Sequence, residues 1–314
     1  MNPLISIVIL SYSDRRLPSL RDLLSSVEEQ TYKFLELVFI VERSVGILKF
    51  VSEWKSKYPK RIYFIEQKTS VADCRNIAVS IATGDIIAFV DDDAKLTEGW
   101  ANEMAATFQN HPSIIGVTGA IIPDWEIESD SDSFPKSLYW MIGCTAWRDS
   151  STRYYLESAQ TLNTAYRREV FCKHKFRIRM YKNEEAASLF SGLQGDDVDF
   201  ALRVTSGTSR KLLYDPHLVV KHKVPHARVE LEFVKRYAFW QGYTEARYSS
   251  LKLAKSRRST VFNPLLRTLA NDLFGGSWLN LRLKTKVIMA LAFFAFGYLW
   301  YMVTASQSKM PFEN

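Results

Sequence analysis

The stretch Ile86-Ile87-Ala88-Phe89-Val90, followed at once by Asp91-Asp92-Asp93, decides the fold. The short apolar run predicts a strand that is buried on both faces, as in a parallel sheet. The carboxylates then fall at the carboxyl edge of the strand, where open α/β sheets bind ligands. Three carboxylates in one turn repel one another, so they favour a hard divalent cation that carries a substrate's phosphates. An acidic helix N-terminus would explain the same residues, and both interpretations stay open.

Outward from this stretch, strand patterns alternate with helical patterns. Strand patterns fall at residues 5–10, 36–41, 61–66, 85–90 and 114–122, and helical patterns at 17–29, 45–57, 71–82 and 100–110. In the first half, each gap between strands leaves room for one crossover helix, so we predict an α/β fold with a mostly parallel, twisted sheet flanked by helices. Gly84 is expected to stop the third helix. The polar, acidic stretch 123–135 is expected to be a loop.

The composition is that of an ordinary globular protein, with 314 residues of which 47% are hydrophobic and 24% charged. The net charge of +7 could face nucleic acid, anionic lipid or a phosphorylated substrate. Cys74, Cys144 and Cys172 form no metal-binding pattern, which fits a reduced, cytosolic setting. The first apolar run, at 4–10, is too short and too β-branched for a secretory signal, so it is expected to start the fold.

Three segments together resemble family 2 glycosyltransferases with the GT-A fold. In that family an Arg-Asn pair opens a helix, an Ala-Thr-Gly-Asp turn follows, and the next strand ends in an acidic DxD-type motif. The matching segments are Val71–Ala78 (VADCRNIA) continued by Ala82–Asp93 (ATGDIIAFVDDD), Asn163–Phe171 (NTAYRREVF) and Gly195–Arg203 (GDDVDFALR). The resemblance covers roughly residues 4–225, in the order that the family requires. It implies a Rossmann-like GT-A sheet and a nucleoside-diphosphate sugar as donor.

The resemblance gives the acidic turn a role in donor binding. It implies that Asp93 coordinates Mn²⁺ or Mg²⁺, that Asp91 contacts the ribose or the metal, and that Asp92 supports the donor site. Such a cation would neutralise the diphosphate of the donor.

Four further residues match donor-binding positions of the family. Arg75 matches an Arg near the base or the phosphates, although a surface helix cation would look the same. Ser11 and Tyr12 occupy the nucleotide-contact loop after the first strand. Glu42 lies near the usual acidic residue at the end of the second strand. Many members read Asp-Asp-Gly-Ser there, whereas this chain reads Val41-Glu42-Arg43-Ser44.

Asp196 and Asp197 match the acidic pair from which the family takes its catalytic base. Asp197 is predicted to remove the proton of the acceptor hydroxyl, with Asp196 binding the acceptor or orienting its neighbour. These acids would also suit the start of a helix through Arg203, and both interpretations can hold. Inversion at the anomeric carbon is implied by the family. His222 resembles a family position near the metal or the diphosphate, although a lone His is more often structural.

Residues 287–305 (VIMALAFFAFGYLWYMVTA) carry no charge, and nineteen helical residues would reach about 28 Å, close to the ~30 Å of a bilayer core. Lys284 and Lys286 precede the run, and Trp300 and Tyr301 lie near its far end. These flanks predict a single-pass helix at the cell membrane, with the catalytic domain on the cytoplasmic side. A buried or interfacial helix is the alternative.

We therefore expect a catalytic domain at 1–226 and an amphipathic, membrane-proximal region at 227–286. The catalytic domain would have a nucleotide-binding half at about 1–122 and an acceptor-side half at about 123–226. The candidate transmembrane helix at 287–305 would be followed by a short tail at 306–314.

The predicted function is that of a metal-dependent, inverting hexosyltransferase that moves a sugar from a nucleoside-diphosphate sugar to a hydroxyl acceptor. The basic, aromatic C-terminal region favours a lipid-linked glycan, on polyprenyl or dolichyl phosphate, in surface polysaccharide synthesis or protein glycosylation. A nucleotidyltransferase of similar fold and a non-catalytic membrane-surface binding protein are the alternatives. Nucleic acid is not an expected partner, because the basic excess lies beside an apolar run and in no recognition module.

Overall fold

The computed structural model describes residues 2–145, 152–157, 159–177, 196–206, 208, 210–250, 269, 272–274 and 281–307. Contacts within the chain divide it into two compact units. Unit 1 holds the described residues of Met1–Asp124, Ser150–Leu189 and Gln194–Lys223, and unit 2 holds those of Trp125–Asp149, Phe190–Leu193 and Val224–Asn314. The predicted functional division at residues 122 and 226 stays a prediction.

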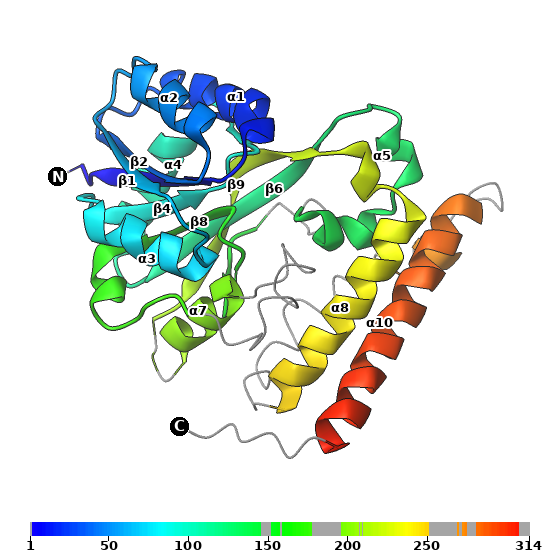
Figure 1. The fold of residues 1–314 in the computed structure, drawn as a ribbon. Coiled ribbons are helices and arrows are strands. Elements are labelled where there is room, and N and C mark those ends of the chain that lie inside the picture. The colour runs from blue at the N-terminus through cyan, green and yellow to red at the C-terminus, as the bar shows by residue number, and fades with distance from the viewer. Residues whose placement is uncertain are drawn as a thin grey trace. The chain divides into compact units, whose positions relative to one another are not determined.

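The strands form one mixed sheet, shown in Figure 1. They are β1 (Ile5–Ser11), β2 (Leu35–Glu42), β3 (Lys60–Ile65), β4 (Ile86–Val90), β5 (Ala94–Leu96), β6 (Gly116–Trp125), β7 (Tyr154–Leu156), β8 (Asn163–Arg167) and β9 (Leu212–Val224). The helices that accompany them are η1 (Asp14–Arg16), α1 (Leu17–Glu28), α2 (Val45–Glu53), α3 (Val71–Ile81), α4 (Trp100–Asn110), η3 (Arg168–Cys172) and α7 (Asp196–Thr205).

The parallel part of the sheet has the spatial order β3-β2-β1-β4. Val8 of β1 lies opposite Val38 on one side and Phe89 on the other. In Figure 1, α1 and α2 cover one face of these strands and α3 covers the other, as right-handed crossovers require when the strand order turns back. β2 and β3 lie on one side of β1, whereas β4 lies on the other, so the strand order reverses between β1 and β4. Such a switch point leaves room for a ligand beyond the carboxyl ends of the two strands.

The remaining strands pair antiparallel in the registers that the structure gives. β8 joins β4 to β6, so that Val90 faces Asn163 and Thr118 faces Thr164. β9 pairs with β5 and with β7. Among the described pairings, parallel pairing is thus confined to the first four strands. The predicted α/β fold is confirmed as a mixed sheet flanked by helices.

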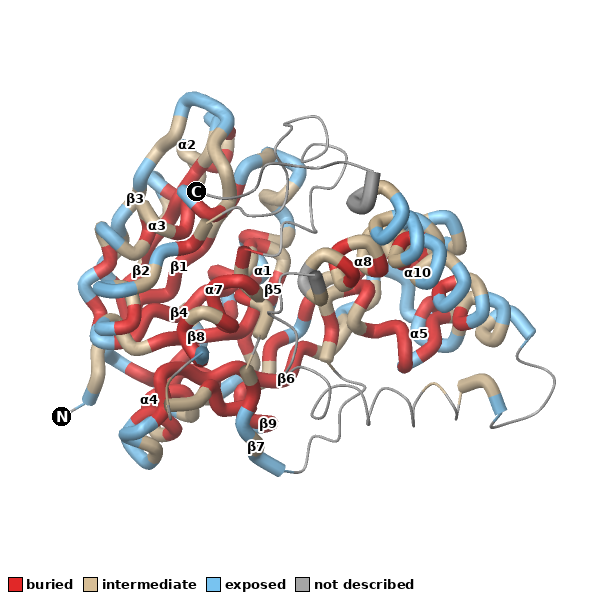
Figure 2. The backbone as a smooth tube through the Cα atoms, turned by 90° about the horizontal axis from the view of Figure 1, so that it is seen from below, coloured by how far each residue is buried: buried red, intermediate tan, exposed pale blue. Residues whose placement is uncertain are grey.

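Burial explains why these strands could be predicted from the sequence. β4 is buried at each of its five positions, and β2 at all but its last residue. Figure 2 shows the same central strands as buried along their length. Helices therefore cover both faces, and the uninterrupted apolar runs are the signature of that double covering.

Ser side chains begin two of the helices that cover the sheet. Ser44 Oγ accepts from the Ile47 N–H at the start of α2, and Ser70 Oγ accepts from the Asp73 N–H at the start of α3. These caps satisfy backbone donors that the first helical turn leaves free.

Gly84 was expected to stop α3, and this expectation is wrong, since α3 ends at Ile81 with Ala82 as its cap. Glycine is required at position 84 because the backbone passes close to β1. A Cβ there would lie 2.5 Å from Ser6 Oγ and 2.7 Å from the Leu4 carbonyl oxygen. The Gly84 N–H instead donates a 2.8 Å hydrogen bond to Ser6 Oγ.

Gly84→Ala is expected to lower the free energy of unfolding by about 1–3 kcal/mol, because the added methyl group must displace β1. Urea unfolding measures this change. Gly99→Asn is the matched control, since Gly99 has φ 75° and open space around it, and Asn tolerates that conformation. Equal stability of the two variants would contradict the close-approach argument.

Unit 2 contains α5 (Asp130–Ser133), η2 (Lys136–Ile142), η4 (His226–Arg228), α8 (Leu231–Ser250) and α10 (Leu281–Gln307). The stretch 123–135, expected to be a loop, instead continues β6 to Trp125 and forms the single turn α5. α10 extends the predicted helix 287–305 at both ends, and residues 308–314 of the predicted tail lie outside the described residues. Within the described part of the chain, Leu281–Thr304 is the one helix long and apolar enough to cross a membrane.

Candidate functional site

The acidic turn lies at the switch point of the sheet, as the sequence predicted. Ser11 ends β1, and Asp91 follows directly on the neighbouring strand β4. Ser11 Oγ donates a 2.6 Å hydrogen bond to Asp92 Oδ2, and both residues are buried. The loop after β1 and the turn after β4 are therefore joined at the edge where ligands bind in this class of sheet.

The carboxylates of this turn hold protons more tightly than ordinary aspartates. Burial is the main cause that raises the pKa of Asp92 to about 7, against the opposing charge of Arg16. Burial and the neighbouring charge of Asp93 also raise the pKa of Asp91. Desolvated carboxylates with like-charged neighbours gain most from a bound cation.

Arg16 is a site residue that the sequence reasoning missed. Its guanidinium forms ion pairs with Asp92, at 3.2 Å, and with Asp93, and it donates a 3.2 Å hydrogen bond to the Tyr12 hydroxyl. Although burial opposes it, these carboxylates raise the pKa of Arg16. The available signal was a cation in the loop after the first strand, at the same edge of the sheet as the acids. Arg16 therefore neutralises part of the negative charge of the acidic turn.

His222 is brought to the acidic turn by strand pairing. β5 pairs with β9 so that Ala94 faces His222, and the Lys223 N–H donates a 2.9 Å hydrogen bond to the Asp93 carbonyl oxygen. His222 Nε2 consequently lies 3.5 Å from Asp93 Oδ1. The sequence prediction that His222 approaches the acidic motif is consistent with this geometry, and its role stays a prediction.

The second acidic group lies at the start of α7 and is held by Arg75 from α3. The buried Arg75 guanidinium pairs with Asp196 Oδ2 at 2.5 Å and donates a hydrogen bond of the same length to Thr161 Oγ1. Arg75 is thus engaged with the acid pair, whereas the family resemblance implied a contact with the donor. Thr161 is a second neighbour that the sequence reasoning missed.

Asp197 is the less enclosed member of this pair. Asp196 is buried against Arg75, while Asp197 is half-buried. Asp197 accepts hydrogen bonds from the Val198 N–H at 2.8 Å and from the Thr161 N–H at 3.4 Å, so its orientation is fixed. Burial and the adjacent Asp196 raise the pKa of Asp197 to about 6.

Arg75 connects the two acidic groups electrostatically. Although burial opposes it, the carboxylates of Asp196, Asp197 and Asp91 together raise the pKa of Arg75. The charge of Arg75 in turn offsets part of the rise in the pKa of Asp91 and of Asp197. The acidic turn and the acid pair therefore belong to one charged region of unit 1.

Glu42 and Tyr12 lie at the same edge of the sheet. Glu42 closes β2 and accepts hydrogen bonds from the Thr69 N–H at 3.2 Å and from Arg43 Nε at 3.1 Å. Arg43 has φ 56°, an uncommon conformation for a residue with a side chain. Tyr12 is half exposed, and the Arg16 guanidinium carbon lies 5.6 Å from the centre of its ring.

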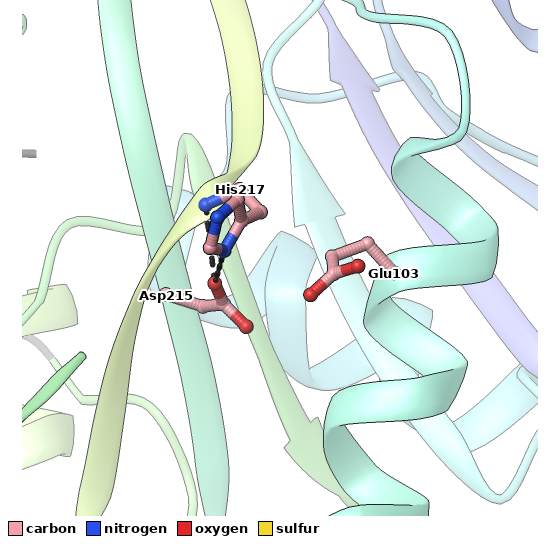
Figure 3. Close-up of side chains that lie close together, drawn as sticks. All are labelled: Glu103, Asp215 and His217. Carbon is pink, nitrogen blue, oxygen red and sulfur yellow. Dashed lines mark hydrogen bonds and ion pairs between the residues drawn. The ribbon is translucent and has the colours of Figure 1, made fainter. Parts of the chain in front are cut away.

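Another group of possible metal ligands lies elsewhere in unit 1. Figure 3 shows Glu103 of α4 close to Asp215 and His217 of β9. Among the described residues, this is the one group of three such side chains whose ligand atoms all lie within 4.8 Å of one another. Arg153 already pairs with both acids, at 2.7 Å to Glu103 and 2.8 Å to Asp215, and Thr107 donates to Asp215 at 2.7 Å. We interpret this group as an ion-pair network, because its negative charge already has a cation.

The residues of the acidic turn fit a divalent cation better. Asp91 and Asp93 offer the oxygen ligands that Mg²⁺ and Mn²⁺ prefer, and His222 offers a nitrogen that Mn²⁺ accepts. Burial is the main cause that raises the pKa of Asp91 and of Asp92, so the ionised carboxylates would be stabilised by a bound cation. Asp93 is the residue that both Arg16 and a metal would contact, so the two cations would compete for it.

Comparisons with known proteins identify the family of the chain. The family described as "Glycosyl transferase family 2" matches residues 6–175. The chain is 25% identical over 242 residues to "Glucosyl-dolichyl phosphate glucuronosyltransferase" of Haloferax volcanii, covering 77% of this chain and 76% of that protein. It is 32% identical over 101 residues to "Uncharacterized glycosyltransferase YwdF" of Bacillus subtilis, covering 32% of this chain and 37% of that protein.

Solved structures share the fold. A mannosyltransferase, PcManGT from Pyrobaculum calidifontis in complex with GDP-Man and Mn²⁺, has a TM-score of 0.57 at 17% identity, covering 97% of this chain and 85% of that one. S. aureus TarS 1–349 has a TM-score of 0.52 at 14% identity, covering 98% of this chain and 93% of that one. Because the family match spans more than half of the chain, the protein belongs to glycosyl transferase family 2.

Proposed function

We propose that this glycosyltransferase moves a sugar from a nucleoside-diphosphate sugar to a hydroxyl group of a lipid-linked acceptor, with inversion at the anomeric carbon. The observation that carries the proposal is the acidic turn at the switch point together with Arg75, which pairs with Asp196 and also interacts electrostatically with Asp91. A donor site and a base within one charged region are what direct displacement requires.

For the donor side, we propose that Asp91, Asp93 and His222 hold Mn²⁺ or Mg²⁺. The bound cation would neutralise the diphosphate and the charge that develops on it as the sugar leaves. Ser11 and Asp92 would fix the loop after β1 against the turn, and Tyr12 and Glu42 would border the nucleotide. A related structure in complex with GDP-Man and Mn²⁺ supports this assignment at the level of the fold.

For the acceptor side, we propose Asp197 as the base. Arg75 already neutralises Asp196, so Asp197 is the member of the pair left to bind a hydroxyl proton. Its backbone hydrogen bonds hold the carboxylate in place. A carboxylate with a pKa of about 6 is ionised at neutral pH and is a stronger base than an ordinary aspartate.

A lipid-linked acceptor and a position at the cytoplasmic membrane face are supported by two observations. One relative carries the name of a dolichyl phosphate glycosyltransferase, and α10 is long and apolar. The sugar, the base of the donor and the linkage are open to direct measurement.

The test is to incubate the purified, full-length protein with Mn²⁺ or Mg²⁺ and a panel of nucleotide sugars, with polyprenyl phosphates and glycosylated polyprenyl phosphates as acceptors. We expect acceptor-dependent release of a nucleoside diphosphate. Release of pyrophosphate would instead indicate nucleotidyl transfer, and tight donor binding without any turnover would indicate a non-catalytic protein.

The rate is expected to depend on pH through Asp197. Because its carboxylate must be deprotonated to accept the proton, kcat/KM, which reports the free enzyme, should be constant above the pKa of about 6 and fall about tenfold per pH unit below it. A pH–rate profile from about pH 4.5 to 8 measures this. Asp92→Asn is the control, since the pKa of Asp92 is also raised. An inflection that disappears in this variant would belong to Asp92 and would exclude the assignment to Asp197.

A further inference from the structure

α10 is apolar on two opposite faces, and among the described residues of unit 2 only one of them is covered. Val287, Ala290 and Gly297 are buried. The opposite face leaves large side chains about half exposed, namely Ile288, Leu291, Leu299, Trp300, Met302 and Val303. Figure 2 shows α10 as largely exposed or intermediate along its length. A helix with one apolar face against protein and another uncovered needs a second apolar surface.

The covered face packs on α8, and the two helices run parallel. Ring centroids lie 5.4 Å apart for Phe239 and Phe296, and 5.0 Å apart for Tyr243 and Tyr301. Figure 1 shows the pair side by side along their length.

Two glycines bring the helix backbones into contact. A Cβ on Gly242 would lie 1.9 Å from the Phe294 carbonyl oxygen, and a Cβ on Gly297 would lie 1.8 Å from the Phe239 carbonyl oxygen. No other residue type fits at either position without separating the helices. Because their backbones are in contact, α8 must lie directly beside α10 wherever α10 is placed.

α8 is unsuited to the interior of a bilayer. It carries Glu232, Lys235 and Arg236 near its start and Glu245 and Arg247 near its end. If α10 crossed the membrane, the parallel α8 would enter the hydrocarbon beside it. A charge in the hydrocarbon disfavours insertion, by about a hundredfold at the bilayer centre and by less toward the interfaces. The structure thus opposes the single crossing that the sequence of α10 alone predicts.

We propose that α10 lies in the plane of an anionic lipid surface, with the exposed face inserted among the acyl chains and α8 on the side away from the lipid. Two basic residues at the start of α10, Arg282 and Lys284, favour lipids with negatively charged headgroups. Trp300 supplies the type of side chain that prefers the boundary between headgroups and hydrocarbon. This placement depends on α8 and α10 alone and is therefore independent of the reaction proposed above.

The placement of the C-terminus tests the proposal. An epitope fused after Asn314 of the full-length protein should resist protease in intact cells and be digested in inverted membrane vesicles, because a helix in the plane leaves both ends on the cytoplasmic side. Carbonate washing should release the protein. Digestion in intact cells together with resistance to carbonate would establish a crossing and overturn the proposal.

Vesicle binding by the purified protein tests the inserted face. Leu299→Glu should lower the partition coefficient into phosphatidylcholine vesicles that contain phosphatidylglycerol by about tenfold or more, and omitting phosphatidylglycerol should weaken the binding of the unaltered protein. Phe34→Glu is the matched control, because Phe34 is similarly exposed but belongs to unit 1. Equal binding of the two variants, or no binding by the unaltered protein, would overturn the assignment.

Discussion

Replacing Asp197 by Asn is expected to lower kcat by about 10²–10⁴-fold while leaving the dissociation constant of the donor within about twofold. The amide cannot take up the acceptor proton, and a positioned general base contributes a factor of this size. Because the side chain keeps its shape and an oxygen that can accept from the Val198 N–H, the start of α7 should be preserved. Single-turnover kinetics measure the chemical step, and calorimetric titration measures donor binding.

Glu103→Gln is the control for the Asp197 experiment. It removes a carboxylate of α4, in unit 1, that pairs with Arg153 in the ion-pair network. This variant should retain nearly full activity. Unchanged turnover in Asp197→Asn would exclude Asp197 as the base, and an equal loss in both variants would indicate a general effect of removing an acid.

Asp93→Asn is expected to weaken Mn²⁺ binding in the presence of donor by about 100-fold or more and to abolish metal-dependent turnover. A neutral amide is a much poorer ligand for a hard cation than a carboxylate. Arg16 would keep its 3.2 Å ion pair with Asp92, so the turn should remain folded. The loss of the free Mn²⁺ signal in electron paramagnetic resonance measures binding directly.

Two variants sharpen the metal experiment. Arg16→Gln removes the cation that shares Asp93 and should strengthen Mn²⁺ binding in the absence of donor. Asp215→Asn changes the ion-pair network and should leave Mn²⁺ binding unchanged. If Asp215→Asn lost the metal and Asp93→Asn kept it, the cation would belong to the network on α4 and β9.

The alternation of the first 110 residues was readable because local periodicity determines it. The predicted helix 100–110 agrees with α4 at both ends, and the predicted strand 85–90 differs from β4 by one residue. Burial on both faces leaves an unbroken apolar run, and the run ends where the chain reaches the open edge of the sheet. The family resemblance assigned both Ser11 and Asp92 to the donor site, and their hydrogen bond is consistent with that assignment.

What the sequence did not reveal depends on contacts between distant segments. The position of Arg16 after the first strand places a cation at the edge of the acids, but its ion pair with Asp93, and the enclosure of Arg75 by Asp196 and Thr161, depend on distant segments. The expected helix stop at Gly84 failed for the same reason, since the requirement for glycine comes from Ser6 on another strand. The apolar pattern of α10 likewise predicts a spanning helix until its partner α8 is known.

The central position of β8 has a consequence for synthesis of the protein. β4 is complete at Val90, but its neighbour β8 begins only at Asn163. A nascent chain that has emerged as far as α4 therefore carries a fully apolar strand with one row of unpaired amides and carbonyls. Such an edge readily pairs with other chains. Truncated chains that stop before Asn163 should aggregate, and co-translational chaperones should bind during this interval.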